Sequence, residues 1–270
     1  KATRHDFDPV KDTPFEYLFL KSKENYHRIN GGSGKGHMTI YQKGMNIHKT
    51  LLTDFDIEVA NYIINEGMGR VCETNIMPVS AEHTGVELIY AFYPNLSWTV
   101  KSDFIAIELN HNTLSIYNLL NGKSFYLKLF GLKNGTIQNV NFNAQQVPYF
   151  EITLSSLPQK LFFVASKDYV FLNSLDENSI LEYKEKDLRK YSEISNINIK
   201  SPVKSFNYFA NNLLYQVYSS RLRGKCGYYQ TGGATGFRDQ LQDCMAFLHS
   251  NPEITREQII YSAGRQYEEG

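Results

Sequence analysis

The chain has 270 residues, of which 42% are hydrophobic, and its 28 basic and 28 acidic residues leave a formal net charge of +0. This balance gives no electrostatic signature of nucleic-acid binding, and we find no apolar run that could cross a bilayer, so we expect neither a nucleic-acid nor a membrane partner. Cys72, Cys226 and Cys244 lie far apart, without metal-ligand spacing. We therefore expect a reducing, cytoplasmic location without disulfides, and no metal site.

The segment from about residue 38 to residue 165 predicts antiparallel strands. Within it, FIAIELNHNTLSIYNLLNGKSFYLKLFGL is rich in Ile, Leu, Phe and Tyr and contains turn residues at Asn110–Asn112 and at Asn121-Gly122. Asn-Gly between two apolar runs is a strong hairpin signal, and a second such pair follows at Asn134-Gly135. Short strands joined by tight turns are typical of an antiparallel β-sandwich.

The composition changes after residue 165. SLDENSILEYKEKDLRKYSEI is strongly charged, and Ser174 with Glu177 fits a capping box, which predicts an exposed connecting helix. Pro202 then interrupts regular structure. The domain prediction is an N-terminal sandwich at 1–165, which we expect to be incomplete, a helical linker at 166–201 and an all-α region at 202–270.

Three helices are predicted after Pro202, each from apolar residues at helical spacing. In the first, Phe209, Leu213, Gln216, Val217 and Ser220 share a face. The second spans residues 237–249, and its apolar stripe consists of Phe237, Leu241, Cys244, Met245 and Leu248. The third begins with a Thr255 and Gln258 capping pair, and the residues expected to point inward are Ile259, Ile260, Ala263 and Tyr267.

The loop NGGSGKGH, residues 30–37, contains glycines and a lysine but does not match a phosphate-binding P-loop. Such a loop requires Ser or Thr directly after the lysine, and a helix after the loop. Here Gly36 follows Lys35, and HMTIYQ reads as a strand. We therefore expect a flexible glycine loop that leads into the sheet.

The stretch YYQTGGATGFRDQLQD, residues 228–243, concentrates hydrogen-bonding groups at the start of the second helix. Asp239 and Asp243 are four residues apart and share a face, with Arg238 and Gln242 beside them. Glycines permit close approach of a ligand to the backbone, while amides, a guanidinium and carboxylates suit sugar hydroxyls. The plain alternative is a solvated helix start. The candidate sugar-binding residues are Gln230, Gly232, Gly233, Arg238, Asp239, Gln242 and Asp243.

The same stretch closely resembles the signature of the inverting glycoside phosphorylases of glycoside hydrolase family 94. LLYQVYSSRLRGKCGYYQ before it and TREQIIYSAGRQYEEG after it resemble the flanking helices, so the resemblance extends over about residues 202–270. The QLQD form is more similar to the β-1,2-oligoglucan phosphorylase and cyclic β-1,2-glucan synthase branch than to the cellobiose branch. The resemblance implies a multidomain β + α fold: a β-sandwich, a helical linker and the first helices of an (α/α)6 barrel.

The resemblance also implies a reaction and a role for each candidate residue. Inorganic phosphate attacks a β-linked gluco-oligosaccharide and yields α-glucose 1-phosphate, so phosphate is a co-substrate and no cofactor is implied. Members of the family are often homodimers. Asp239 binds hydroxyls of the cleaved sugar, with Arg238, Gln242 and Asp243 beside it. The general acid and most phosphate ligands are expected beyond Gly270. In disaccharide phosphorylases an arginine tends to stand in the glycine turn, where this chain has Gly233.

Two other readings stay open on the sequence. One is a non-catalytic carbohydrate-binding or interaction protein derived from such an enzyme. The other is a fragment of a cyclic β-1,2-glucan synthase. The chain starts at Lys1 and ends at Gly270 within a helical pattern. From this we expect a piece of a longer protein, which would be inactive as a glycosyltransferase by itself.

Overall fold

The computed structural model describes ten stretches of the chain. They are residues 16–22, 25–31, 35–80, 86–92, 105–119, 122, 124–141, 148–194, 198–218 and 237–264. The chain divides into two compact units, Lys1–Asp187 and Leu188–Gly270. The predicted boundaries at residues 165 and 201 stay predictions. Among the described residues, no helix has both the length and the apolar character that a bilayer crossing requires.

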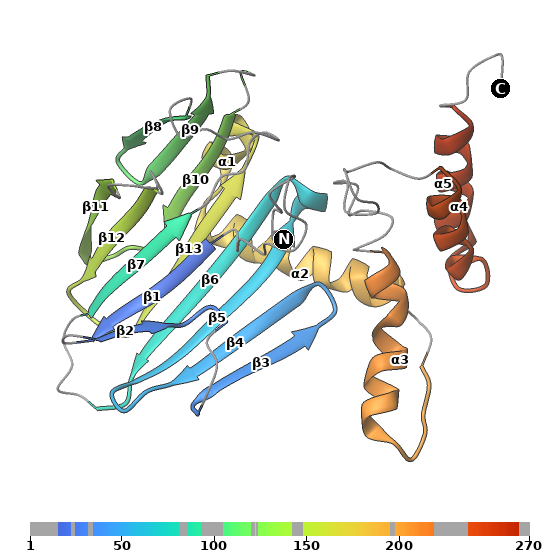
Figure 1. Ribbon diagram of the computed structural model, residues 1–270, viewed down its shortest axis with the longest axis horizontal. Helices are drawn as coiled ribbons and strands as arrows, with labels where there is room; N and C mark the ends of the chain where they lie inside the picture. The colour runs from blue at the N-terminus through green and yellow to red at the C-terminus, as the bar shows by residue number, and fades with distance from the viewer. Residues whose placement is uncertain are drawn as a thin grey trace. The chain divides into compact units, whose positions relative to one another are not determined.

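The described strands of the first unit form two antiparallel sheets (Figure 1). The larger sheet has the strand order β3-β4-β5-β6-β13-β10-β9-β8, and the smaller sheet has the order β11-β12-β7-β1-β2. In chain order the strands are β1 (Glu16–Ser22), β2 (Asn25–Arg28), β3 (His37–Gln42), β4 (Met45–Leu51), β5 (Phe55–Ile64), β6 (Gly69–Pro78), β7 (Val86–Phe92), β8 (Ile105–Asn110), β9 (Thr113–Asn118), β10 (Ser124–Phe130), β11 (Gly135–Asn141), β12 (Pro148–Leu154) and β13 (Gln159–Ser166). A short 3-10 helix, η1 (Asn65–Gly67), joins β5 to β6.

Local turn chemistry predicted two hairpins correctly and one wrongly. β8 and β9 pair across the turn that contains His111, and β9 and β10 pair across the turn that contains Gly122. Asn134-Gly135 is not a hairpin turn, because β10 lies in the larger sheet whereas β11 pairs with β12 in the smaller one. At this crossing Gly131 has φ +84°, and a Cβ there would overlap the carbonyl oxygen of Lys160.

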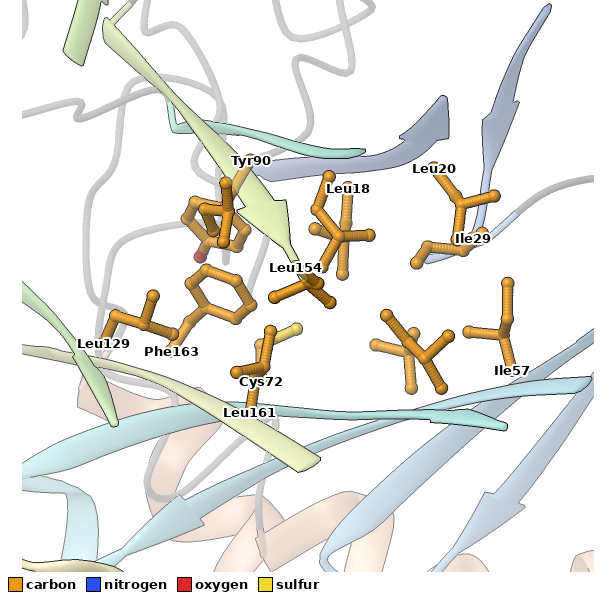
Figure 2. Packing of buried hydrophobic residues seen from close by; sticks show 14 of the residues in the cluster. Leu18, Leu20, Ile29, Ile57, Cys72, Tyr90, Leu129, Leu154, Leu161 and Phe163 are labelled. Atoms are coloured by element: carbon orange, nitrogen blue, oxygen red, sulfur yellow. The ribbon is translucent and has the colours of Figure 1, made fainter. Parts of the chain in front are cut away.

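The main core fills the space between the two sheets (Figure 2). Tyr90 of the smaller sheet stacks on Phe163 of the larger sheet, with ring centroids 4.2 Å apart and an interplanar angle of 4°. Leu18 and Leu20 of β1 are fully buried in this core, as is Ile29, which directly follows β2. The prediction that strands begin near residue 38 was therefore wrong. β1 and β2 precede them and close one side of the core.

The opposite face of the larger sheet is also buried, because two helices pack on it. Along β5, Ile57 and Val59 face the smaller sheet, whereas Tyr62 and Ile64 lie in the second core. This alternation follows from the two-residue period of a strand. The helices are α1 (Tyr169–Ser174) and α2 (Glu177–Ile194), which contribute Phe171, Leu172 and Ile180 to this core.

The charged stretch predicted as one helix forms α2, and a second helix, α1, precedes it; each has its own cap. Asp168 accepts a hydrogen bond from the Phe171 N–H at 2.9 Å and starts α1. Ser174 and Glu177 do not form the predicted capping box. Instead, Asp176 accepts from the Ser179 N–H at 2.7 Å, and the Ser179 hydroxyl oxygen accepts from the Asp176 N–H at 2.8 Å. Ser174 is already the last residue of α1, so it cannot start α2.

Replacing Asp168 by alanine should lower the free energy of unfolding by about 1 kcal/mol, because one orphan N–H of α1 loses its acceptor. The measurement is urea-induced unfolding. A matched control is Asp56→Ala, which is exposed on β5 and lies outside any helix cap, and which we expect to change the stability by less than about 0.5 kcal/mol. Equal effects of the two substitutions would show that Asp168 does not act as a cap.

The second unit contains short helices around a small core. They are α3 (Lys204–Gln216), α4 (Phe237–Cys244), the 3-10 helix η4 (Met245–Phe247) and α5 (Pro252–Ala263). Its core consists of Ile194, Leu214, Tyr218, Cys244 and Phe247, with Tyr191, Val217 and Ile254 packed against it.

Helical periodicity located these helices but misjudged which face is buried. On α3, Phe209 and Leu213 are exposed, and Leu214 is buried instead. On α4, Cys244 of the predicted stripe is buried, but Met245 and Leu248 after it are exposed, whereas Phe247 is fully buried. The buried face of α3 is thus displaced by one residue from the predicted one, and in η4 the buried residue is Phe247.

The prediction for α5 was wrong in two respects. Ile259 and Ile260, predicted to point inward, are 48% and 55% exposed. Thr255 and Gln258 do not cap the helix, which starts after Asn251, with Pro252 in its first turn. Both are buried side chains within the helix. The polar residues of α5, and not its isoleucines, thus face the rest of the unit.

Candidate functional site

The predicted sugar-binding residues lie on α4 and in the segment before it. Arg238 and Gln242 are exposed, and Asp243 is partly exposed. Asp239 lies within α4, although its side chain is outside the described part of the structure. Gln230, Gly232 and Gly233 also lie outside the described residues, so the glycine turn stays a prediction. The structure therefore brings Arg238, Asp239, Gln242 and Asp243 together on one eight-residue helix.

The arrangement of side chains around α4 follows from helical geometry. Gln240 and Cys244 are buried, and successive residues are separated by about 100°. Arg238 and Gln242 are each two residues from Gln240 and therefore lie on the opposite side of the helix. This places a guanidinium and a carboxamide on the exposed face. Both groups donate hydrogen bonds of the kind that hold sugar hydroxyls or phosphate oxygens.

A polar contact holds α4 against α5, which lies beside it (Figure 1). The Gln258 Nε2 donates to the Gln240 Oε1 at 3.2 Å and to the Ser262 Oγ at 3.3 Å. The Thr255 hydroxyl donates to the Cys244 carbonyl oxygen at 2.7 Å, at the last residue of α4. All of these side chains are less than 10% exposed. Sequence reasoning missed this network because it assumed an apolar interface, although Gln258 and Ser262 have helical i, i+4 spacing.

Of the two described cysteines, Cys244 lies on α4, but its surroundings do not make it a nucleophile. Burial raises the pKa of the Cys244 thiol, and the neighbouring Asp243 carboxylate raises it further. Its Sγ donates to the Leu241 carbonyl oxygen at 3.0 Å. A protonated, buried thiol is a packing group and lacks the thiolate that nucleophilic chemistry requires.

A second cluster of charged groups lies in the first unit, on the face of the larger sheet that α2 covers. Glu73 is 3% exposed, and its carboxylate contacts Lys160 at 2.7 Å and Lys184 of α2 at 2.6 Å. The Tyr62 hydroxyl also donates to it at 2.9 Å. Burial opposes ionisation of Glu73, but the hydrogen bonds from the two lysines prevail and keep its pKa below the ordinary value. The geometry is that of an architectural ion cluster that fastens α2 to the sheet.

Neither the glycine loop nor the histidines form a site within the described residues. Asn30 at the start of the loop is buried, and its Oδ1 accepts from the Leu18 N–H at 2.8 Å. A strand, β3, follows the loop, as predicted. In the part of the chain that the structure describes, no three His, Cys, Asp or Glu side chains are grouped so that they could hold a metal ion.

Comparison with known proteins identifies relatives for part of the chain. Residues 191–270 match the model of the glycosyl hydrolase 94 superfamily, catalytic domain. The sequence is 43% identical over 75 residues to the cyclic β-(1,2)-glucan synthase NdvB from Rhizobium meliloti (strain 1021). These 75 residues are 27% of this chain and 3% of the synthase. A solved structure of a human-microbiome protein assigned as a kojibiose phosphorylase matches 90% of the chain at 11% identity with a TM-score of 0.57.

The last comparison shows the fold alone, because the identity is low. The antiparallel sheets and the few helices that follow them match 37% of that solved chain. This chain thus spans about a third of the matched structure and a far smaller fraction of the matched synthase.

Proposed function

We propose that the chain supplies part of the sugar subsite of an inverting glycoside phosphorylase, because residues 191–270 match the model of the glycosyl hydrolase 94 superfamily, catalytic domain. The family match carries this proposal, since it includes α4 and the whole of α5. In the proposal, the helices of the second unit begin an (α/α)6 barrel, and β-linked gluco-oligosaccharides and inorganic phosphate are the substrates.

The reaction needs one carboxylic acid and an anionic nucleophile. The acid protonates the glycosidic oxygen as the bond from the anomeric carbon to that oxygen breaks. A phosphate oxygen attacks the anomeric carbon from the opposite face, so a β-glucoside gives α-glucose 1-phosphate. Phosphate takes the place of the base-activated water of an inverting hydrolase, so a second catalytic carboxylate is not required. The acid is expected from polypeptide beyond Gly270.

In this proposal the residues of α4 act by holding the sugar. The Asp239 carboxylate accepts hydrogen bonds from hydroxyls of the sugar that is cleaved, and Arg238 and Gln242 donate to oxygen atoms beside it. A fixed ring orientation contributes to the rate because the anomeric carbon is then already placed for in-line attack. Asp243, one turn after Asp239, provides a second acceptor on the same flank of the helix.

The test is a phosphorolysis assay with the full-length polypeptide that contains this chain. Linear β-1,2-, β-1,3- and β-1,4-gluco-oligosaccharides are each incubated with inorganic phosphate, and the sugar phosphate is identified by ³¹P and ¹H NMR. We expect α-glucose 1-phosphate, formed only when phosphate is present. Release of free glucose without phosphate would indicate a hydrolase. Saccharide binding without turnover would favour the non-catalytic alternative.

A specific observation favours one second candidate, which is a region of a cyclic β-1,2-glucan synthase. The 43% identity to such a synthase extends over 75 residues. In this case the same sugar subsite would act on β-1,2-glucan chains within a much longer protein. Turnover of β-1,3- or β-1,4-linked chains would exclude the synthase reading. Turnover of β-1,2-linked chains alone is expected of a synthase and also of a β-1,2-oligoglucan phosphorylase, and a very long parent polypeptide with transmembrane segments would then indicate the synthase.

A further inference from the structure

The interface between α4 and α5 contains amide and hydroxyl groups, although burying apolar side chains at the same positions would cost less free energy. Gln240, Gln258 and Ser262 are 6%, 7% and 5% exposed. Burying a carboxamide is unfavourable unless its donors and acceptors find partners. Both acceptors of the Gln258 amide group, Gln240 Oε1 and Ser262 Oγ, are in place. The interface is therefore satisfied, but it is not the arrangement that would maximise stability.

Hydrogen bonds differ from apolar contacts in being directional. An apolar interface lets a helix turn slightly or slide without losing much energy, since the hydrophobic effect is not directional. An amide-to-amide hydrogen bond prefers an angle above about 150° and weakens steeply below about 120°. The Gln258–Gln240 bond therefore limits the rotation of α4 about its own axis. The Thr255 bond to the Cys244 carbonyl oxygen fixes the position of its last turn along α5.

Rotation of α4 directly controls its exposed face. With a radius of about 5–6 Å including side chains, a turn of about 20° displaces an outer atom by roughly 2 Å. A misplacement of about 1 Å at a reacting group can lower a rate by about 100-fold. Arg238 and Gln242 lie opposite Gln240 on α4, so their placement depends on this rotation.

We propose that Gln240, which accepts a hydrogen bond from Gln258, is a positioning residue that sets the rotation of α4 and thereby orients its polar face toward the sugar. The role rests on the proposed function, because it concerns the same subsite. Gln240 itself is buried and acts through Arg238, Asp239 and Gln242. The alternative is that the network is only a way of packing two helices together.

A pair of methionine substitutions separates these possibilities. In Gln240→Met or Gln258→Met alone, one buried carboxamide loses its partner, so we expect a lower melting temperature. In the double variant both partners are apolar and similar in shape, so the melting temperature should return close to that of the wild type. We expect kcat/KM of the full-length enzyme to stay about 10-fold below wild type in the double variant. Recovery of turnover together with stability would overturn the proposal.

The surface variant Gln42→Met is the matched control, because Gln42 is exposed on β3. It makes the same chemical change outside the interface, and we expect wild-type turnover. If Gln42→Met lost as much turnover as the double variant, the loss would come from a glutamine-to-methionine change at any position and not from the interface, and the proposal would be overturned.

A second readout does not depend on enzymatic activity. Nitroxide labels are attached to cysteines introduced at Gln242 on α4 and at Glu257 on α5, both exposed, in a Cys226→Ser background. The buried thiols of Cys72 and Cys244 are shielded from the label. Double electron–electron resonance should give a narrow distance distribution with the native glutamines and a broadened or shifted one in the double methionine variant. An unchanged distribution overturns the positioning role.

The two proposals fail in different experiments. If the phosphorolysis assay yields no glucose 1-phosphate from any glucan, the proposed function is refuted, but the distance measurement between α4 and α5 stays valid.

Discussion

Replacing Asp239 by asparagine in the full-length polypeptide is expected to lower kcat/KM for glucan phosphorolysis by about 100-fold or more. The substitution keeps the size of the side chain but replaces one acceptor oxygen of the carboxylate by an amide donor. Charge-assisted hydrogen bonds from sugar hydroxyls are then lost, and one hydroxyl faces a donor where it needs an acceptor. Because orientation of the ring contributes to the rate, the effect should appear in kcat as well as in KM.

The melting temperature of this variant should stay close to that of the wild type, since α4 keeps its buried residues. The matched control is Glu257→Gln, an equivalent acid-to-amide change at an exposed position of α5. This control should leave phosphorolysis unchanged. Turnover of Asp239→Asn at the wild-type level would remove Asp239 from the proposed sugar subsite, and with it the role carried over from the family signature.

Replacing Glu73 by alanine is expected to lower the free energy of unfolding of the first unit by about 3 kcal/mol. Breaking a buried ion pair by removing one partner typically costs about 3–5 kcal/mol, because the remaining charge is left buried. The lower end of this range is expected because the Lys160 side chain is 42% exposed and regains contact with water after the substitution. The Lys184 side chain is 19% exposed, so its charge stays mostly buried and accounts for the remaining cost. Urea-induced unfolding followed by circular dichroism measures the difference.

The exposed pair Lys49–Glu58 provides the control on the same sheet. Its side chains are 44% and 37% exposed and approach to 2.9 Å. Surface ion pairs contribute only about 0–1 kcal/mol, so Glu58→Ala should have a much smaller effect than Glu73→Ala. If the two substitutions destabilise the protein equally, burial of Glu73 does not determine its contribution.

The same carboxylate predicts a pH dependence of stability. Burial raises the pKa of Glu73, but the lysine hydrogen bonds lower it by more, so its value in the folded protein lies below the ordinary 4.5. The resulting stabilisation is fully present above pH 4.5 and is lost as the pH falls through the lower folded value. The decrease in unfolding free energy below pH 4.5 should therefore be shallower in Glu73→Gln than in the wild type.

Features encoded by neighbouring residues were predictable from the sequence, whereas features that depend on distant partners were not. The turn at Asn110–Asn112 fixes a hairpin by itself. Asn134-Gly135 has the same local chemistry, but its following strand finds a partner in the other sheet. β1 and β2 were missed although Leu18 and Leu20 are fully buried. β1 contains a short continuous apolar run and β2 has only four residues, so neither shows a decisive periodicity, and their partners, here β7 and the core, make them recognisable as strands.

The candidate site shows the same division between local and long-range information. The family signature places Arg238, Asp239, Gln242 and Asp243 on one short helix, and the structure has that helix. Periodicity predicted that Ile259 and Ile260 would face inward, but Gln258 does so because its amide finds a partner on α4. The orientation of a helix is decided by its neighbours, and a pattern of apolar residues along one helix does not contain that information.

Helix α2 begins in one unit and ends in the other, and its side chains are divided between two cores. Ile180 is buried in the second core of the β-unit, and Ile194 is buried among the helices of the second unit. A cut after Asp187 would leave Ile180 and Ile194 each with its own core but would interrupt α2 within its length, whereas a cut after Ile194 would leave that side chain attached to the wrong fragment. Exchange of modules between related genes within α2 would therefore either interrupt this helix or remove a side chain from one of the two cores.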